Sequence, residues 1–183
     1  MEGKKVTTRK KTLKRNPNYV RLYKEPVSTE SIKVLFEVFS NYAPLSKVGY
    51  SFRNFYDIGA GIGQTIIGMT HMNTTLQSVG IELLPEKVQI GNGAIEKIRD
   101  ASIRRRIELV CISEINESVH YNNACWISIN TISDSTTLFE KLANEVVKGC
   151  IIVSSNSTEN PAFKELNNIT MPDNLRVYVY TKL

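Results

Sequence analysis

A glycine-rich turn followed by an acidic residue is the part of this sequence whose residue types and spacing could do chemistry. The turn reads Asp57-Ile58-Gly59-Ala60-Gly61-Ile62-Gly63-Gln64, and Glu82 follows in Gly80-Ile81-Glu82. Glycines let backbone N–H groups approach a ligand closely, and an acid at the next strand end can accept both hydroxyls of a ribose. The pattern therefore predicts a site for a nucleoside cofactor. The alternative is a glycine-rich turn in an ordinary α/β domain.

The elements that must position this turn follow it in the expected order. A strand over residues 55–58 precedes it, a helix over 64–72 follows, and a second strand covers 76–81. Pro85 suits a first helical position, so a helix should run to about Arg99.

The rest of the chain continues the alternation of strands and helices. Apolar runs predict strands at 107–111, 124–129 and 150–153. Helices are expected after Ser28 and from a cap at Ser135 to a stop at Gly149. Alternation in 175–180 predicts an antiparallel strand with one face toward water. The fold is therefore expected to be α/β: a Rossmann-like, mostly parallel seven-stranded sheet, with helices on both faces and an antiparallel C-terminal strand.

Basic residues are concentrated at the start of the chain. Residues 1–24 hold nine Lys or Arg and one acid, whereas the remainder holds 14 basic and 17 acidic residues. Residues 1–18 are too poor in aliphatics to support a core, so we expect a disordered basic arm at 1–18 and one domain at 19–183. Such an arm suits nucleic acid or a nucleosome. A solubilising or nuclear import sequence is the alternative, and the latter favours the nucleus.

Composition argues against several other classes. No run of about 18 apolar residues exists, so no membrane span is expected. The charged start has no apolar signal segment. Three cysteines and two histidines lack metal-ligand spacing, so we expect no metal, no disulfides and buried strand thiols in a reducing intracellular compartment.

The candidate site residues follow the predicted strands, where ligands bind in open α/β sheets. Asp57 lies near the end of the first predicted strand, and Glu82 would hold the cofactor's ribose or instead cap the next helix. Glu114 would accept the adenine amino group, with Ile115 over the ring, or be a plain surface acid. Asn130 would line the ligand site, or simply start a turn.

Asp57 before the G-x-G-x-G turn resembles the cofactor loop of class I S-adenosylmethionine methyltransferases. Further stretches are similar to the histone-lysine methyltransferases named for disruption of telomeric silencing, over about residues 20–183. These are Gln64 at the end of the glycine motif, the Tyr23-Lys24-Glu25 segment, Asn130, and Gly149-Cys150-Ile151-Ile152-Val153-Ser154-Ser155. The chain departs from that family at Ile129-Asn130-Thr131, where one Asn and an aromatic of its Asn-Asn-Phe are missing.

The resemblance implies S-adenosylmethionine-dependent methylation of a lysine on a histone or other nucleic-acid-associated protein. Tyr23 and Glu25 would close over the cofactor, and Asn130 would be the catalytic residue. Asp57 would position the methionine part of the cofactor, and the turn would carry it through Gly59, Ala60, Gly61, Gly63 and Gln64. Two alternatives stay open: a nucleic acid acceptor, or an inactive methyltransferase-like subunit that docks on nucleic acid or a ribonucleoprotein.

Overall fold

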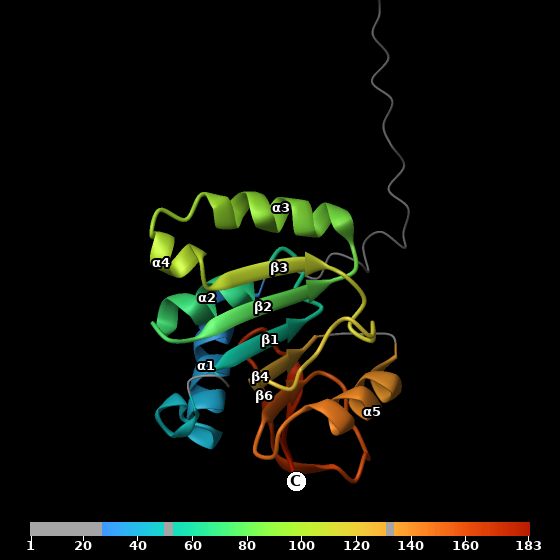
Figure 1. Cartoon of the computed structure of the whole chain (residues 1–183). Helices are drawn as coiled ribbons and strands as arrows, with labels where there is room; N and C mark the ends of the chain where they lie inside the picture. Colours follow the sequence, from blue (N-terminus) through green and yellow to red (C-terminus); the bar gives the residue numbers. More distant parts are fainter. Residues whose placement is uncertain (1–26, 50–52, 131–133) are drawn as a thin grey trace, which may run out of the picture.

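Seven strands form one mixed sheet in the computed structural model, which describes residues 27–49, 53–130 and 134–183 (Figure 1). The spatial order is β3-β2-β1-β4-β5-β7-β6. The pairs of β7 with β5 and with β6 are antiparallel, and the other four pairs are parallel. The strands are β1 Asn54–Ile58, β2 Gln77–Glu82, β3 Ile107–Cys111, β4 Ala124–Ile129, β5 Ile151–Ser154, β6 Phe163–Thr170 and β7 Arg176–Lys182. The expected fold class is confirmed. The order reverses between β1 and β4, so the crevice for a ligand should open at their carboxyl ends.

Helices cover both faces of the sheet. Their bounds are α1 Thr29–Tyr42, α2 Gln64–Met72, α3 Pro85–Glu96, α4 Ala101–Arg104 and α5 Ser135–Glu145, with a 3₁₀ turn at Leu45–Lys47. One apolar cluster joins α1, α2 and α3 to one face, and a second joins α5 to the other. Two separate cores therefore fix the central strands from both sides, which explains why β4 is buried along its whole length.

The helix starts follow capping chemistry. Ser28 caps α1 by accepting from the Ser31 N–H, as the sequence predicts, and Pro85 is the first residue of α3. The cap of α5 is Asp134 rather than Ser135, because the Asp134 carboxylate accepts from the Thr137 N–H. This helix also ends at Glu145, well before Gly149.

Three other expectations were wrong in detail. The helix from Pro85 ends at Glu96, and the separate helix α4 follows with Asp100 as its cap. Cys111 is exposed, unlike the buried Cys125 and Cys150. On β7, Tyr180 is buried rather than facing water, because it packs on Phe139 of α5.

The strand β6 was not located from sequence. It carries alternating polar side chains and lies at the sheet edge, so its apolar signal is weak. Within the described ranges, no helix is long and apolar enough to cross a membrane.

Candidate functional site

The glycine turn connects β1 to α2 at the point where the strand order reverses. Gly59, Gly61 and Gly63 all have positive φ values, of 76°, 59° and 80°. L-residues with side chains rarely adopt such values, so the three glycines are required by the backbone path. The N–H groups of Gly59 and Ala60 both donate to the Ile81 carbonyl, at 2.9 and 3.0 Å. These bonds hold the turn against the end of β2, next to Glu82.

Two further glycines let neighbouring elements approach the turn. A Cβ on Gly91 of α3 would lie 2.7 Å from the Ile62 carbonyl oxygen and 2.3 Å from a methyl of Leu109. A Cβ on Gly80 of β2 would lie 2.9 Å from the Ala60 Cβ. The sequence reasoning missed Gly91, since an isolated glycine within a helical pattern gives no sign of what packs against it.

The Glu82 carboxylate is buried at the end of β2 and bonds directly to the glycine turn. Its Oε2 accepts from the Gly61 N–H at 2.9 Å, and its Oε1 accepts from the Leu84 N–H at 3.0 Å. The Lys87 ammonium lies 3.9 Å from Oε2. Because Leu84 is the N-cap residue of α3, Glu82 does assist the start of that helix, but it is not a solvated acid. Each carboxylate oxygen keeps a second lone pair for a ligand hydroxyl.

The Asp57 carboxylate is fully buried at the end of β1. Its Oδ1 accepts from the Asn130 side-chain amide at 2.9 Å, whereas its Oδ2 has no hydrogen-bond partner. Burial raises the pKa of Asp57 from about 3.8 to about 7, and the charge of Glu82 adds to the rise. The nearby side chains of Ser128, Thr65 and Asn130 lower that pKa, although neither hydroxyl reaches Oδ2 with hydrogen-bond geometry.

A buried carboxylate oxygen without a hydrogen-bond donor destabilises the folded state unless a ligand supplies the donor. The ammonium group of an amino-acid ligand, or a water held by one, would supply that partner. The described residues thus fit a ligand with an amino-acid end near Asp57 and ribose hydroxyls near Glu82. By contrast, they hold no cluster of three or more His, Cys, Asp or Glu arranged for a metal ion.

Asn130 follows β4 directly and faces the glycine turn. The backbone N–H of Asn130 donates to the Ile58 carbonyl at 2.9 Å, and a Cβ on Gly59 would lie 3.4 Å from the Asn130 Cβ. Since its amide nitrogen bonds to Asp57, its side chain bridges the ends of β1 and β4. Thr131, which the sequence comparison singled out, lies outside the described residues, as do Tyr23, Glu25 and the arm at 1–18.

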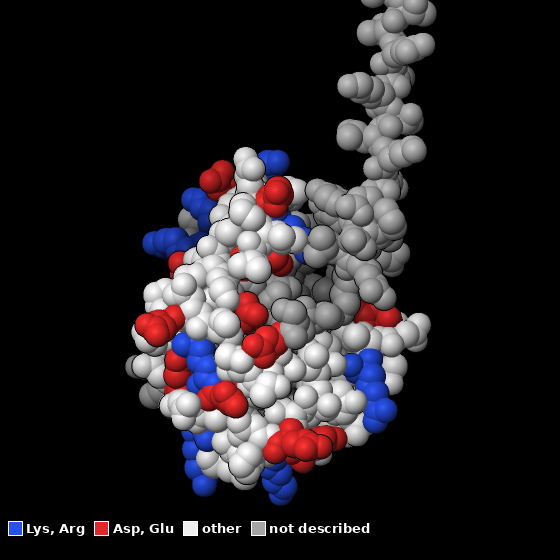
Figure 2. All heavy atoms as spheres, turned by 90° about the vertical axis from the view of Figure 1, so that its right-hand side faces the viewer, with Lys and Arg blue, Asp and Glu red and all other residues white. Residues whose placement is uncertain are grey.

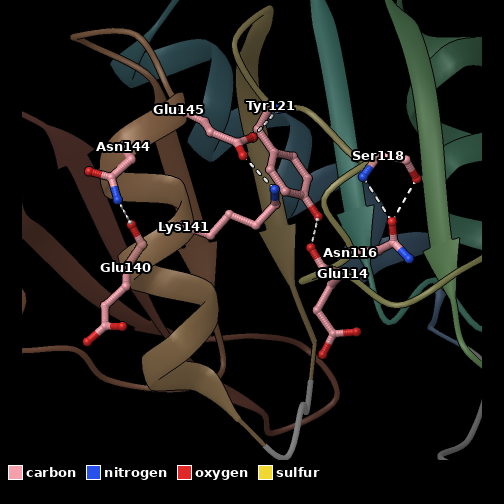
Figure 3. Close-up of polar contacts among 8 residues, drawn as sticks. All are labelled: Glu114, Asn116, Ser118, Tyr121, Glu140, Lys141, Asn144 and Glu145. Atoms are coloured by element: carbon pink, nitrogen blue, oxygen red, sulfur yellow. Dashed lines mark hydrogen bonds and ion pairs between the residues drawn. The ribbon is translucent and has the colours of Figure 1, made fainter.

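Glu114 and Ile115 lie in the connection 112–123 between β3 and β4. The connection begins beside the site, because the Ile112 N–H donates to the Glu82 carbonyl at 3.1 Å. The Glu114 backbone carbonyl accepts from the Tyr121 hydroxyl at 2.9 Å, and Ile115 is exposed (Figure 3). Gln64, the remaining predicted residue, is the first residue of α2.

Two cavities lie away from the glycine turn. One of about 430 Å³ is lined by α5 and residues 157–161, with Phe139 among its walls and Glu140 and Glu159 as its charged residues. The other, of about 330 Å³, lies at the opposite end of the sheet and is lined by residues around Lys47 and Lys148. Figure 2 looks onto the carboxyl ends of the parallel strands and shows carboxylates in the middle of that face. The Lys and Arg residues described on this face lie as separate groups toward its edges.

Comparisons with known proteins identify the fold. No protein-family profile and no curated protein matches the sequence. An RNA methyltransferase from Salinibacter ruber, solved with S-adenosyl-L-homocysteine, is similar with a TM-score of 0.66 at 17% identity, over 86% of this chain and 94% of that one. A putative caffeoyl-CoA O-methyltransferase from Staphylococcus aureus gives a TM-score of 0.68 at 10% identity, over 87% and 86%.

The same fold also appears in a cyclase. The [4+2]-cyclase SpnF matches with a TM-score of 0.58 at 12% identity, over 78% of this chain and 60% of that one. At such identities the likeness concerns the fold, and function must be argued from the site. The chain therefore has the Rossmann-like fold found in these methyltransferases.

Proposed function

We propose that this chain is an S-adenosylmethionine-dependent methyltransferase. The observation that carries the proposal is the pair of buried carboxylates on either side of the glycine turn, Asp57 and Glu82. One has an oxygen without a partner, and the other is held by the turn itself. Asp57 lies at the end of β1, beside the point where the strand order reverses, and Glu82 ends the neighbouring strand β2. The similar structures include one solved with S-adenosyl-L-homocysteine.

Each group has a separate task in this proposal. The ribose hydroxyls would donate to the free lone pairs of Glu82, and the amino group would face Asp57. Glu114 and Ile115 would take the adenine base, and Tyr23 and Glu25 would close over the ligand. Asn130 keeps the Asp57 carboxylate in place and offers its remaining oxygens to the acceptor.

S-adenosylmethionine supplies an electrophilic methyl group when it is bound. What the chain itself must do is align the acceptor with that group and exclude water. None of these tasks requires a metal ion. The rate would then depend on how accurately the carboxyl ends of β1 and β4 hold their side chains.

Calorimetric titration with S-adenosylmethionine and S-adenosylhomocysteine tests the proposal. We expect a single site with a dissociation constant well below the millimolar range. A folded protein that binds neither compound at millimolar concentration would contradict the proposal. Heat from S-adenosylhomocysteine but no transfer to any acceptor would instead support the inactive docking subunit.

For the acceptor, we propose a lysine on a nucleic-acid-associated protein such as a histone. Two features support a cationic acceptor chain: the resemblance to the telomeric-silencing family, and the cavity beside α5, whose charged lining residues are both acidic. Carboxylates attract basic side chains and repel phosphates, so this cavity favours a basic protein over a nucleic acid. The basic start of the chain would hold the nucleic acid to which that protein is bound, in the nucleus for a histone.

An RNA acceptor is the second candidate. It is favoured by the likeness to the Salinibacter ruber RNA methyltransferase and by the basic residues at 1–24. Transfer of a labelled methyl group to nucleosomes, free histones, RNA and DNA in parallel separates the two. Label on nucleic acid would displace the lysine proposal.

A further inference from the structure

The connection 112–123 carries the two residues assigned to adenine but contains no described helix or strand. Connections of about 12 residues without secondary structure are uncommon and are often functional. A base-binding residue on such a segment needs something else to fix its position. The contacts of Tyr121 provide it.

Tyr121 is fully buried beneath the connection that it belongs to. Its ring meets the Tyr56 ring edge-on, with centroids 5.2 Å apart, and the Lys141 ammonium lies 5.8 Å from its centroid. Its N–H donates to Glu145 Oε2 at 2.9 Å, and the other oxygen of Glu145 pairs with Lys141 (Figure 3). The ring is therefore anchored to both β1 and α5.

The one polar group on that anchored ring is directed at Glu114. The Tyr121 hydroxyl donates to the Glu114 carbonyl at 2.9 Å. Burial raises the pKa of Tyr121, so the phenol keeps its proton and remains a donor. Figure 3 shows the Glu114 side chain extending away from Tyr121, so the bond fixes the backbone and leaves the carboxylate free.

Other bonds hold the remainder of the connection without touching Glu114 itself. Asn116 Oδ1 accepts from both the N–H and the hydroxyl of Ser118, at 2.9 and 2.7 Å. At the far end, the Tyr56 hydroxyl donates to Asn123 Oδ1 at 2.9 Å. Among the described residues, the Tyr121 hydroxyl is therefore the side-chain group that orients the residue assigned to the base.

We infer that Tyr121 is a positioning residue that makes the site selective for a 6-aminopurine over a 6-oxopurine. Holding the Glu114 backbone keeps its carboxylate where an exocyclic amino group can donate to it. A 6-oxo group presents an acceptor at the same place and is repelled. This inference rests on the proposed function and deepens it, because it names a residue that sets the nucleobase preference.

The test compares S-adenosylhomocysteine with its analogue that carries hypoxanthine in place of adenine, by calorimetric titration. Wild type should prefer the adenine compound by about tenfold or more, since a hydrogen bond to a charged group is lost with the analogue. Tyr121→Phe removes only the hydroxyl and should narrow the preference to about threefold or less. A general loss of stability would weaken both compounds alike and leave their ratio unchanged.

Tyr180→Phe is the matched control, because Tyr180 is also buried and its hydroxyl accepts from the Thr158 N–H, in another loop, at 3.1 Å. It should keep the wild-type preference. If Tyr121→Phe does not fold, Glu145→Gln loosens the grip on the same ring and should narrow the preference in the same direction.

The outcomes separate the inference from the function on which it rests. Wild type that binds neither compound contradicts the proposed function, and the inference with it. Equal affinity of wild type for the two compounds would mean that Glu114 does not contact the base. That result would overturn the inference but not the proposed function. Binding with full preference retained in the folded Tyr121 or Glu145 variant also overturns it.

Discussion

The side-chain amide of Asn130 donates to the carboxylate of Asp57 across the point where the strand order reverses, over 2.9 Å and a separation of 73 residues. This bond joins the ends of β1 and β4, the two strands that border the proposed ligand. It also links a residue assigned to the acceptor with one assigned to the methyl donor. A substitution of either residue should therefore alter the hydrogen bonding of the other.

Asp57→Asn should stabilise the ligand-free chain at high pH. Folding raises the pKa of Asp57 to about 7, so the folded state binds its proton more tightly than the unfolded state does. The free energy of unfolding therefore falls as pH rises from about 4 to about 7, and the loss is complete above that window. At pH 8 the variant should be more stable by on the order of 2–4 kcal/mol, with little gain at pH 4. Urea unfolding at both pH values measures this, and an equal effect at both would contradict it.

Asn130→Ala should make the affinity for S-adenosylhomocysteine fall more steeply as the pH is lowered. The Asn130 amide lowers the pKa of Asp57, so its loss leaves the carboxyl protonated to a higher pH. If the ionised form receives the ligand's ammonium group, affinity for S-adenosylhomocysteine should fall about tenfold at pH 6.5 but only a few fold at pH 8.5. Titration at the two pH values gives the answer. A loss of equal size at both would leave Asn130 with a purely steric role.

Glu82→Ala should weaken S-adenosylhomocysteine binding strongly. It removes a charged acceptor for the ribose and leaves the Gly61 and Leu84 N–H groups without their partner. Loss of such a bond costs about 1.5–3 kcal/mol, or roughly 10- to 150-fold in affinity. Glu86→Ala is the matched control, because Glu86 is an exposed acid in the first turn of α3, close to Glu82 in the chain. This variant should bind as wild type does. Equal binding by all three proteins would remove Glu82 from the site.

Gly91→Ala should disturb the turn, whereas Gly93→Ala should not. A methyl group on Gly91 would press on the Ile62 carbonyl and Leu109, but one on Gly93 meets nothing within 4 Å. We expect Gly91→Ala to cost about 1–3 kcal/mol of stability and to weaken ligand binding as well. Gly93→Ala should gain up to about 1 kcal/mol, because alanine favours the helix. Urea unfolding of the two variants tests the packing of α3, and similar values for both would refute it.

Deletion of residues 1–18 should reduce the salt dependence of binding to duplex DNA and leave S-adenosylhomocysteine affinity unchanged. Each phosphate neutralised by the basic residues contributes about 0.9 to the slope of log affinity against log salt. Fluorescence anisotropy from low to moderate salt measures that slope with and without the segment. The same slope for both proteins would mean that the segment has another task.

The sequence by itself determined the order of the elements and the nature of the turn. Local residue patterns predicted the bounds of α2, β3 and β4 as the structure has them, because each depends on residues close together in the chain. The glycine motif predicted the turn for the same reason, and the structure adds that its three glycines have positive φ values. The edge strand β6 lacked such a local signal, because its side chains are mostly polar. The cap of α5 was placed one residue too late, although the bond between Asp134 and the Thr137 N–H is itself local.

Only the tertiary structure decided what the candidate side chains contact. Burial of Asp57 and the bond from Asn130 arise from packing β4 beside β1, which no local pattern encodes. The same holds for Tyr121, which no motif in the sequence singled out. Its hydroxyl meets Glu114 because β1 and α5 enclose its ring, and such an arrangement exists only once the two faces of the sheet are covered.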